Sequence, residues 1–322
     1  MTTGFNAPTG FNTPVPANMA GTGRPRRPRR ERTLSTGPSF WYAAPALTMF
    51  VGFAIIPLLV VLGLSFTNWD GIGPITPAGI DNWISAFADP QTYQSLGLTL
   101  QMMILSWVIQ TPLSILIGVF TAGRQKYRAL YAVLFFVPLL ISSAAIALSW
   151  RALLDPNFGL GASSGLPWLS KDWLGNPETA LFVVIIIITW QYVPFHALLY
   201  QGGVQQIPAS MYEAARLDGA GRVQQFFHIT LPQLRNTIIT SSTLMLVGSL
   251  AYFDIVYVLT MGGPGTATRV LPLHMYLTGF AGQNMGVASV LAVILVVLGL
   301  ALSLGLTKLS GFSKMTSDLE GA

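Results

Sequence analysis

The chain of 322 residues is 52% hydrophobic and only 9% charged, whereas soluble domains carry about 25% charged residues, so a water-soluble globular protein is excluded. Cysteine is absent, which excludes disulfides and cysteine-based nucleophiles or metal sites. The net charge of +5 is concentrated in six arginines within residues 24–32. No aromatic residue lies among them, so we interpret this run as a solvated tail and not as a nucleic-acid site.

Residues 1–39 contain too few bulky apolar residues to fold alone, and we expect a disordered, arginine-rich cytoplasmic tail. Six later stretches are long and apolar enough to cross a bilayer, which takes about 20 residues each. They are residues 40–66, 97–122, 129–151, 179–203, 233–260 and 284–307. The predicted fold is therefore an all-α membrane domain of six helices over residues 40–310, followed by a short cytoplasmic tail, residues 311–322.

Prolines lie inside four of the predicted spans, and kinks are expected at them, because neighbouring helices or water can satisfy the freed backbone groups. They include Pro57, Pro112, Pro138 and Pro194.

The distribution of lysine and arginine sets the orientation, because these residues are retained on the cytoplasmic side of short loops. If the tail is inside, that side holds fourteen of the seventeen Lys and Arg residues. The other side holds only Arg151, Lys171 and Arg269, together with six acids. Both termini are thus predicted to be cytoplasmic, and the outer loops are short.

Residues 204–232 form the largest predicted inner loop after the tail, with the marks of a short helix followed by a turn. Ser210 and Glu213 have the spacing of a capping box, so we expect a helix to begin at Ser210. Gly219 suits the left-handed position that ends helices. A second helical stretch from Arg222 is predicted to gather its apolar side chains on one side, with a proline in the first turn of the next span. These residues are Val223, Phe226, Phe227, Leu231 and Pro232.

The pattern leaves two interpretations of this loop open. It is either an amphipathic helix that lies in the membrane interface and seals the bundle, or a rigid projection that transmits a push from a soluble partner into the helices.

The loop contains the pattern Glu213–Ala214–Ala215, three residues, Gly219, nine residues, Ile229, one residue and Leu231–Pro232. This pattern resembles the EAA loop of permease subunits of binding-protein-dependent ABC importers. Other segments are similar to the first of the two paired permeases in the maltose-type carbohydrate branch: IIPLLVVLGLSFTNWDG, ALSWRALLDPNFGL, IPASMYEAARLDGAG and FDIVYVLTMGGPGTAT. The resemblance extends over about residues 40–308. The chain departs from it in lacking a large outer insertion between the third and fourth spans, and in having Asn236 where a proline often stands.

The resemblance implies a coupling helix between the fourth and fifth spans that docks into a cytoplasmic ATPase subunit. Its implied contact and turn residues are Glu213, Ala214, Ala215, Arg216, Asp218 and Gly219. The implied partners are a second permease, two ATPase subunits that bind ATP and magnesium, and an extracytoplasmic binding protein that delivers a sugar or oligosaccharide. The chain has no G-x-x-x-x-G-K-[ST] loop, so we predict that it is not itself an enzyme and holds no cofactor.

Two groups of residues are candidates for the solute path. Asp254 is the acid well inside a predicted span, where a carboxylate is functional by default, unless it lies near the outer interface beside water or Arg269. Tyr252 and Tyr257 flank it.

Tyr192, His196 and Tyr200 share one face of the fourth helix. This face either lines a sugar route or forms hydrogen bonds between helices. The three histidines have no evident carboxylate partners, so no metal site is predicted.

Three other functions compete with a sugar permease. A permease of the same superfamily for an anionic solute such as glycerol phosphate should place basic groups along the route. An ion-coupled secondary transporter should contain several intramembrane ionisable groups, and Asp254 alone is thin support. A membrane enzyme would need converging nucleophiles, carboxylates or metal ligands, and the sequence shows no such set.

Overall fold

The structure is a computed structural model that describes residues 40–123, 128–165, 168 and 170–310. The two predicted tails, residues 1–39 and 311–322, lie outside the described residues. The chain divides into two compact units after Val51. In the first unit the described residues form helix α1 (Phe40–Phe50) and the first residue of the π-helical turn η1 (Val51–Ile55).

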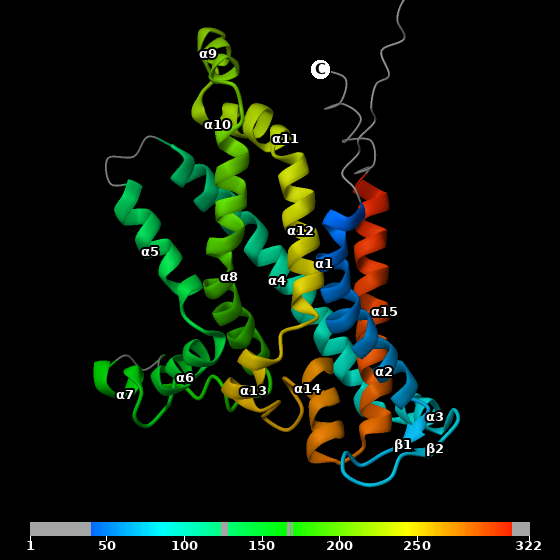
Figure 1. The fold of residues 1–322 in the computed structure, drawn as a ribbon. Coiled ribbons are helices and arrows are strands. Elements are labelled where there is room, and N and C mark those ends of the chain that lie inside the picture. Colours follow the sequence, from blue (N-terminus) through cyan, green and yellow to red (C-terminus); the bar gives the residue numbers. More distant parts are fainter. Residues whose placement is uncertain (1–39, 124–127, 166–167, 169, 311–322) are drawn as a thin grey trace, which may run out of the picture. The chain divides into compact units, whose positions relative to one another are not determined.

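The second unit is almost entirely helical (Figure 1). After η1 its helices are α2 (Ile56–Leu64), α3 (Asp81–Ala88), α4 (Pro90–Ala122), α5 (Arg128–Leu140), α6 (Ser143–Leu153), α7 (Leu160–Ser164), α8 (Ala180–Gln205), α9 (Ala209–Leu217), α10 (Arg222–Gln225), the π-helical η2 (Phe226–Thr230), α11 (Leu231–Gln233), α12 (Arg235–Ser249), α13 (Asp254–Thr260), α14 (Leu271–Tyr276), the π-helical η3 (Leu277–Ala281) and α15 (Met285–Ser310). The departure from an all-α fold is one antiparallel pair of two-residue strands, β1 (Thr67–Asn68) and β2 (Thr76–Pro77).

Four helical segments are each long and apolar enough to cross a membrane: Trp41–Leu64, Pro90–Ala122, Ala180–Gln205 and Met285–Lys308. Two bent pairs qualify together, Val133–Leu140 with Ser143–Leu153, at 104°, and Arg235–Ser249 with Asp254–Thr260, at 50°. The described residues therefore hold four candidate spans, or up to six if each bent pair is one span, close to the positions predicted from the sequence.

The positions at which helices are interrupted coincide with prolines only in part. Helices α4 and α8 continue through Pro112 and Pro194, whereas α5 ends two residues after Pro138. The break between α12 and α13 contains no proline. It follows Gly248 and Ser249, a pair of the kind that bends helices where backbone bonds are easily displaced.

Helices α4 and α8 pack against each other more extensively than any other pair of described elements. Gly118 permits the close approach, because an added Cβ atom would lie 2.7 Å from the carbonyl oxygen of Ala197 and from the Cβ atom of Tyr200. The main apolar core lies beside this contact and joins α4, α6, α8 and α13. Its fully buried members include Met102, Ala147, Val184, Ile185, Ile188 and Val256. This core lies in the middle of the unit, between α9 at one end and the loops at the other.

Candidate functional site

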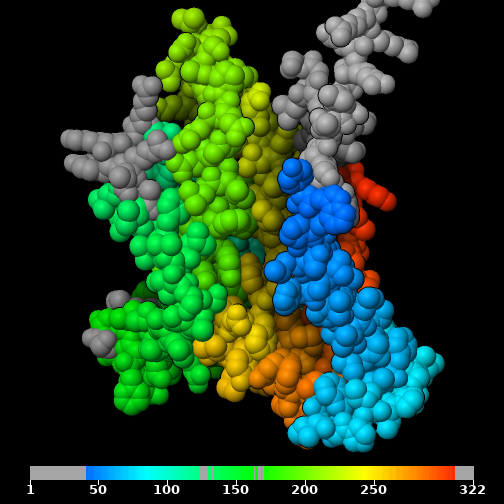
Figure 2. All heavy atoms as spheres, viewed as in Figure 1, coloured from blue at the N-terminus to red at the C-terminus, as the bar shows by residue number. Residues whose placement is uncertain are grey.

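Helix α9 projects from the end of the unit at which α8 ends and α12 begins (Figures 1 and 2). None of its residues is buried. The helix begins at Ala209 with Pro208 in the N-cap position, where no side chain caps it. The predicted start at Ser210 with a Ser210–Glu213 capping box was wrong, because Pro208 occupies the position that the serine oxygen would need.

The end of α9 has the predicted form. Gly219 has a φ of +80°, and its N–H donates to the carbonyl of Arg216 over 3.1 Å. The N–H of Ala220 donates to the carbonyl of Ala215 over 2.8 Å. These two bonds form a Schellman motif, which satisfies carbonyls left free at the helix end. The glycine therefore fixes where the chain turns back towards the membrane-spanning helices.

Two buried polar side chains hold α9 to the following segment. The hydroxyl of Tyr212 lies 2.9 Å from that of Thr230, and Gln225 Nε2 donates to the carbonyl of Ala220 over 2.8 Å. Thr230 and Gln225 are both buried. The base of the projection is thus fixed, while its tip is open.

The tip of α9 combines exposed charges with exposed apolar residues. Glu213, Ala214, Arg216, Asp218 and Gly219 are exposed, and Ala215 is half-buried. Leu217 is 90% exposed, and Val223 and Phe227 are also exposed. Where exposed apolar side chains form a contiguous patch, the patch marks an interaction site.

The second helical stretch differs from its prediction. Phe226 and Leu231 pack against the buried residues Tyr200 and Leu234, whereas Val223 and Phe227 point outward. The predicted single apolar face was wrong because residues 226–230 form a π turn, whose extra residue changes the direction of the side chains that follow. Pro232 lies in α11, a three-residue helix that precedes α12, and not, as was predicted, in the first turn of the span itself.

A packed connection runs from this loop into the middle of the unit. Leu234, fully buried, contacts Tyr200 of α8 and Ile115 of α4. One turn back along α8, His196 Nδ1 lies 2.9 Å from Ser241 Oγ of α12. His196 and Tyr200 are therefore buried between helices in this conformation, and their contacts are those of helix packing.

The other candidate path residues fall into two places. The rings of Tyr192 and Tyr252 lie 5.3 Å apart, joining α8 to the break before α13. Asp254, exposed, is the first residue of α13. Tyr257 lies farther along α13, within an aromatic cluster formed with Phe253, Tyr276 and Phe280.

A polar group that the sequence reasoning missed lies next to Tyr252. Gln110 of α4 is 1% exposed and its amide lies close to the side chain of Tyr252, but neither amide atom makes a hydrogen bond of regular geometry. Ser106, one turn earlier on the same helix, is buried and has no partner for its hydroxyl. The available signal was the spacing of polar residues along an otherwise apolar span.

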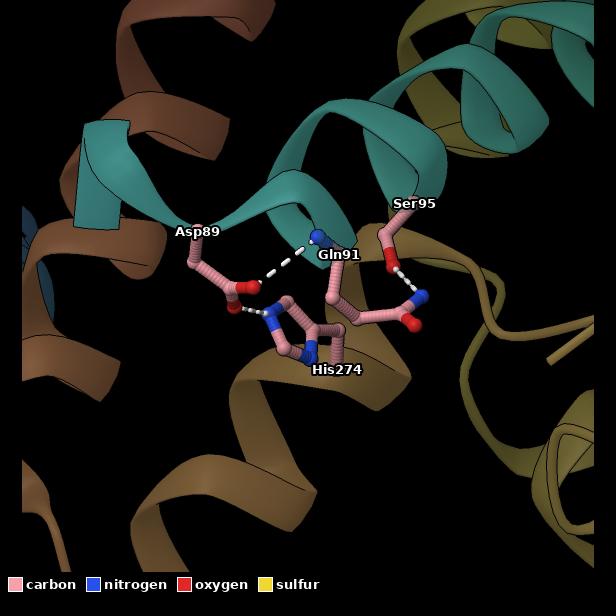
Figure 3. Close-up of polar contacts among 4 residues, drawn as sticks. All are labelled: Asp89, Gln91, Ser95 and His274. Carbon is pink, nitrogen blue, oxygen red and sulfur yellow. Dashed lines mark hydrogen bonds and ion pairs between the residues drawn. The ribbon is translucent and has the colours of Figure 1, made fainter. Parts of the chain in front are cut away.

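At the end opposite α9, a contact between a histidine and a carboxylate links two segments far apart in the sequence (Figure 3). Asp89 Oδ2 lies 3.4 Å from Nε2 of the buried His274, and Asp89 Oδ1 accepts from the N–H of Gln91 over 2.9 Å. The expectation that the histidines lack carboxylate partners was wrong for His274. Within the described residues no group of three metal-ligating side chains occurs.

Comparisons with known proteins place residues 110–310 in the family described as binding-protein-dependent transport system inner membrane component. A probable ABC transporter permease protein YurN of Bacillus subtilis is 36% identical, over 82% of this chain and 93% of that protein. The trehalose/maltose transport system permease protein MalF of Thermococcus litoralis is 29% identical, over 84% and 92%.

One solved structure, that of a bacterial ABC transporter involved in the import of the acidic polysaccharide alginate, shares the fold. Its matching chain has a TM-score of 0.73 at 23% identity, over 84% of this chain and 94% of that chain.

Proposed function

We propose that this chain, which belongs to the family of binding-protein-dependent transport system inner membrane components and is thus an ABC transporter permease of the bacterial inner membrane, serves a sugar or oligosaccharide importer. With a second permease it forms the path for a sugar that an extracytoplasmic binding protein delivers. Relatives named for the transport of arabinooligosaccharides and of trehalose/maltose support the sugar class. ATP hydrolysis takes place in two separate ATPase subunits.

The proposed topology has six spans with both termini in the cytoplasm. Its support is the charge at the two ends of the second unit. Arg216, Arg222 and Lys308 lie at the end that carries α9, while Asp89, the partner of His274, lies at the other. Positive charge is retained on the cytoplasmic side, so α9 faces the cytoplasm.

In this proposal α9 is the coupling helix. The observation that carries it is an exposed helix whose base is bonded, through Tyr212 and Thr230, to η2, the segment that leads into the membrane-spanning helix α12. Its contact residues are Glu213, Ala214, Ala215, Arg216, Asp218 and Gly219. Leu234 and Tyr200 pass its displacement to α8, and His196 passes it to α12.

The route for the solute lies around Tyr192, Tyr252, Asp254 and Tyr257, where α8 meets the break between α12 and α13. A neutral solute is favoured over an anion because no Lys or Arg occurs in residues 89–123, 180–215 or 236–268. Aromatic and uncharged polar groups are the ones that recognise a sugar.

The test is an affinity purification of the tagged chain from gently solubilised native membranes, with mass spectrometry of all proteins that accompany it. An ABC ATPase, a second permease and a solute-binding protein are expected. The variant Ala214→Glu, which adds charge and bulk to the exposed face of α9, should lose the ATPase but keep the second permease. Gln205→Glu, an exposed site at the end of α8, is the control and should keep both. Retention of the ATPase by Ala214→Glu would refute the coupling role of α9.

A further inference from the structure

The buried face of α4 carries an unusual series of polar residues. They recur at intervals of three, four or seven positions, which keeps them on one side of the helix. The series is Thr92, Ser95, Thr99, Ser106, Gln110, Ser114 and Thr121, all buried. It extends along nearly the whole length of a helix that is long enough to cross a membrane.

Most polar groups on either side of the centre of this face are hydrogen-bonded, although Thr92 Oγ1, near the start of the helix, has no partner. Thr99 Oγ1 donates to the carbonyl of Ser95 over 2.8 Å and accepts from the N–H of Leu271 over 2.8 Å. Ser114 Oγ donates to the carbonyl of Val193 over 3.3 Å. Thr121 donates to a carbonyl of its own helix. These residues have ordinary structural roles.

The centre of the face is different. Ser106 Oγ and both amide atoms of Gln110 are buried without a partner. Most buried polar side chains in folded proteins are bonded, and each exception calls for an explanation. An unpaired amide costs free energy that a leucine in the same apolar span would not. Tyr252 lies close to the amide but makes no hydrogen bond of regular geometry with it, so the amide is unsatisfied in this conformation.

We propose that Gln110 is a specificity-determining residue of the solute route, and that its amide binds hydroxyl groups of a neutral, polyhydroxylated solute when the route opens. An amide both donates and accepts, which matches a hydroxyl and gives an anion no balancing charge. Tyr252, beside Gln110, lies in the break between α12 and α13, so a change of the bend there would uncover the amide. This inference rests on the proposed function, because it needs a route that opens.

The absence of cysteine from the chain allows a direct test by thiol labelling. Gln110→Cys is treated in native membranes with a small, positively charged methanethiosulfonate, without nucleotide and with ATP plus vanadate. Labelling in at least one of these states is expected. Met102→Cys, two turns earlier on α4 and fully buried in the apolar core, is the matched control and should stay unlabelled.

Ile72→Cys, in an exposed outer turn, shows that the reagent reacts. If Gln110→Cys stays unlabelled in both states while Ile72→Cys reacts, or if Met102→Cys is labelled equally, the proposal is overturned.

The melting temperature of the purified complex gives a second, independent result. Gln110→Leu removes an amide that has no partner, and should raise the melting temperature by roughly 2–4 °C. Trp107→Phe on the same helix removes the bond of Trp107 Nε1 to Ser242 Oγ, at 2.9 Å, and should lower it. A Gln110→Leu melting temperature that is unchanged or lower would show that the amide is already bonded, and would refute the proposal.

These measurements separate the two proposals. Labelling and melting need neither the solute nor a working ATPase. Failure at Gln110 in a complex that still contains the ATPase refutes only the role of Gln110. A wild-type chain that purifies without any ATPase refutes the importer itself.

Discussion

Replacing Gly219 tests whether the turn after α9 sets the direction of the projection. At a φ of +80°, a residue with a Cβ atom is strained by about 1–2 kcal/mol. No atom lies within 4 Å of the position of an added Cβ atom, so the cost comes from the backbone alone. Gly219→Val should therefore shift the balance between the capped and the uncapped turn by about 5- to 30-fold. Asn adopts the left-handed conformation readily, so Gly219→Asn is the matched control.

The assay is the amount of ATPase subunit that co-purifies with each variant, relative to the amount of permease in the membrane. Gly219→Val should retain clearly less ATPase than the wild type, and Gly219→Asn nearly as much. Equal retention by all three would show that the Schellman turn is not needed for docking. Equal loss in both variants would show that any side chain obstructs the surface, and would refute the reasoning from strain.

Three further results are expected. Gly118→Ala should destabilise the chain by about 1–3 kcal/mol, because the new methyl group overlaps α8, and thermal melting would detect this. Burial lowers the pKa of His274 despite the attraction of Asp89. The buried neutral histidine therefore contributes stability above the unfolded pKa of about 6.5, and this contribution is lost as pH falls. The melting temperature of His274→Gln should accordingly change less between pH 7.5 and 5 than that of the wild type. A double-mutant cycle of Tyr212→Phe and Thr230→Val should give a coupling of about 0.5–1.5 kcal/mol in the same melts.

The sequence predicts the spans well because long apolar runs have few other structures available in a bilayer. It predicts their interruptions poorly. Pro112 and Pro194 lie in unbroken helices, while the break at Leu250–Phe253 contains no proline. A proline only removes one backbone bond, and neighbouring helices decide whether the helix bends.

The candidate site was likewise predictable from the sequence only in part. Gly219 was predictable because few residues other than glycine adopt a positive φ without strain. The capping box at Ser210 failed because Pro208, two residues earlier, takes the N-cap position. Gln110 was missed because averaging hydropathy over a span hides one amide, and whether that amide has a partner depends on helices distant in the sequence.

Because η2 is a π turn, the number of residues in the loop after α9 determines the direction in which α9 points. Each residue of a helix turns the chain by about 100°, so deleting one residue from Phe226–Thr230 would convert the turn to an ordinary one and point α9 in another direction. A substitution at Phe227 or His228, both exposed, leaves that direction unchanged. Insertions and deletions should therefore be far rarer in this segment among functional variants than changes of residue type.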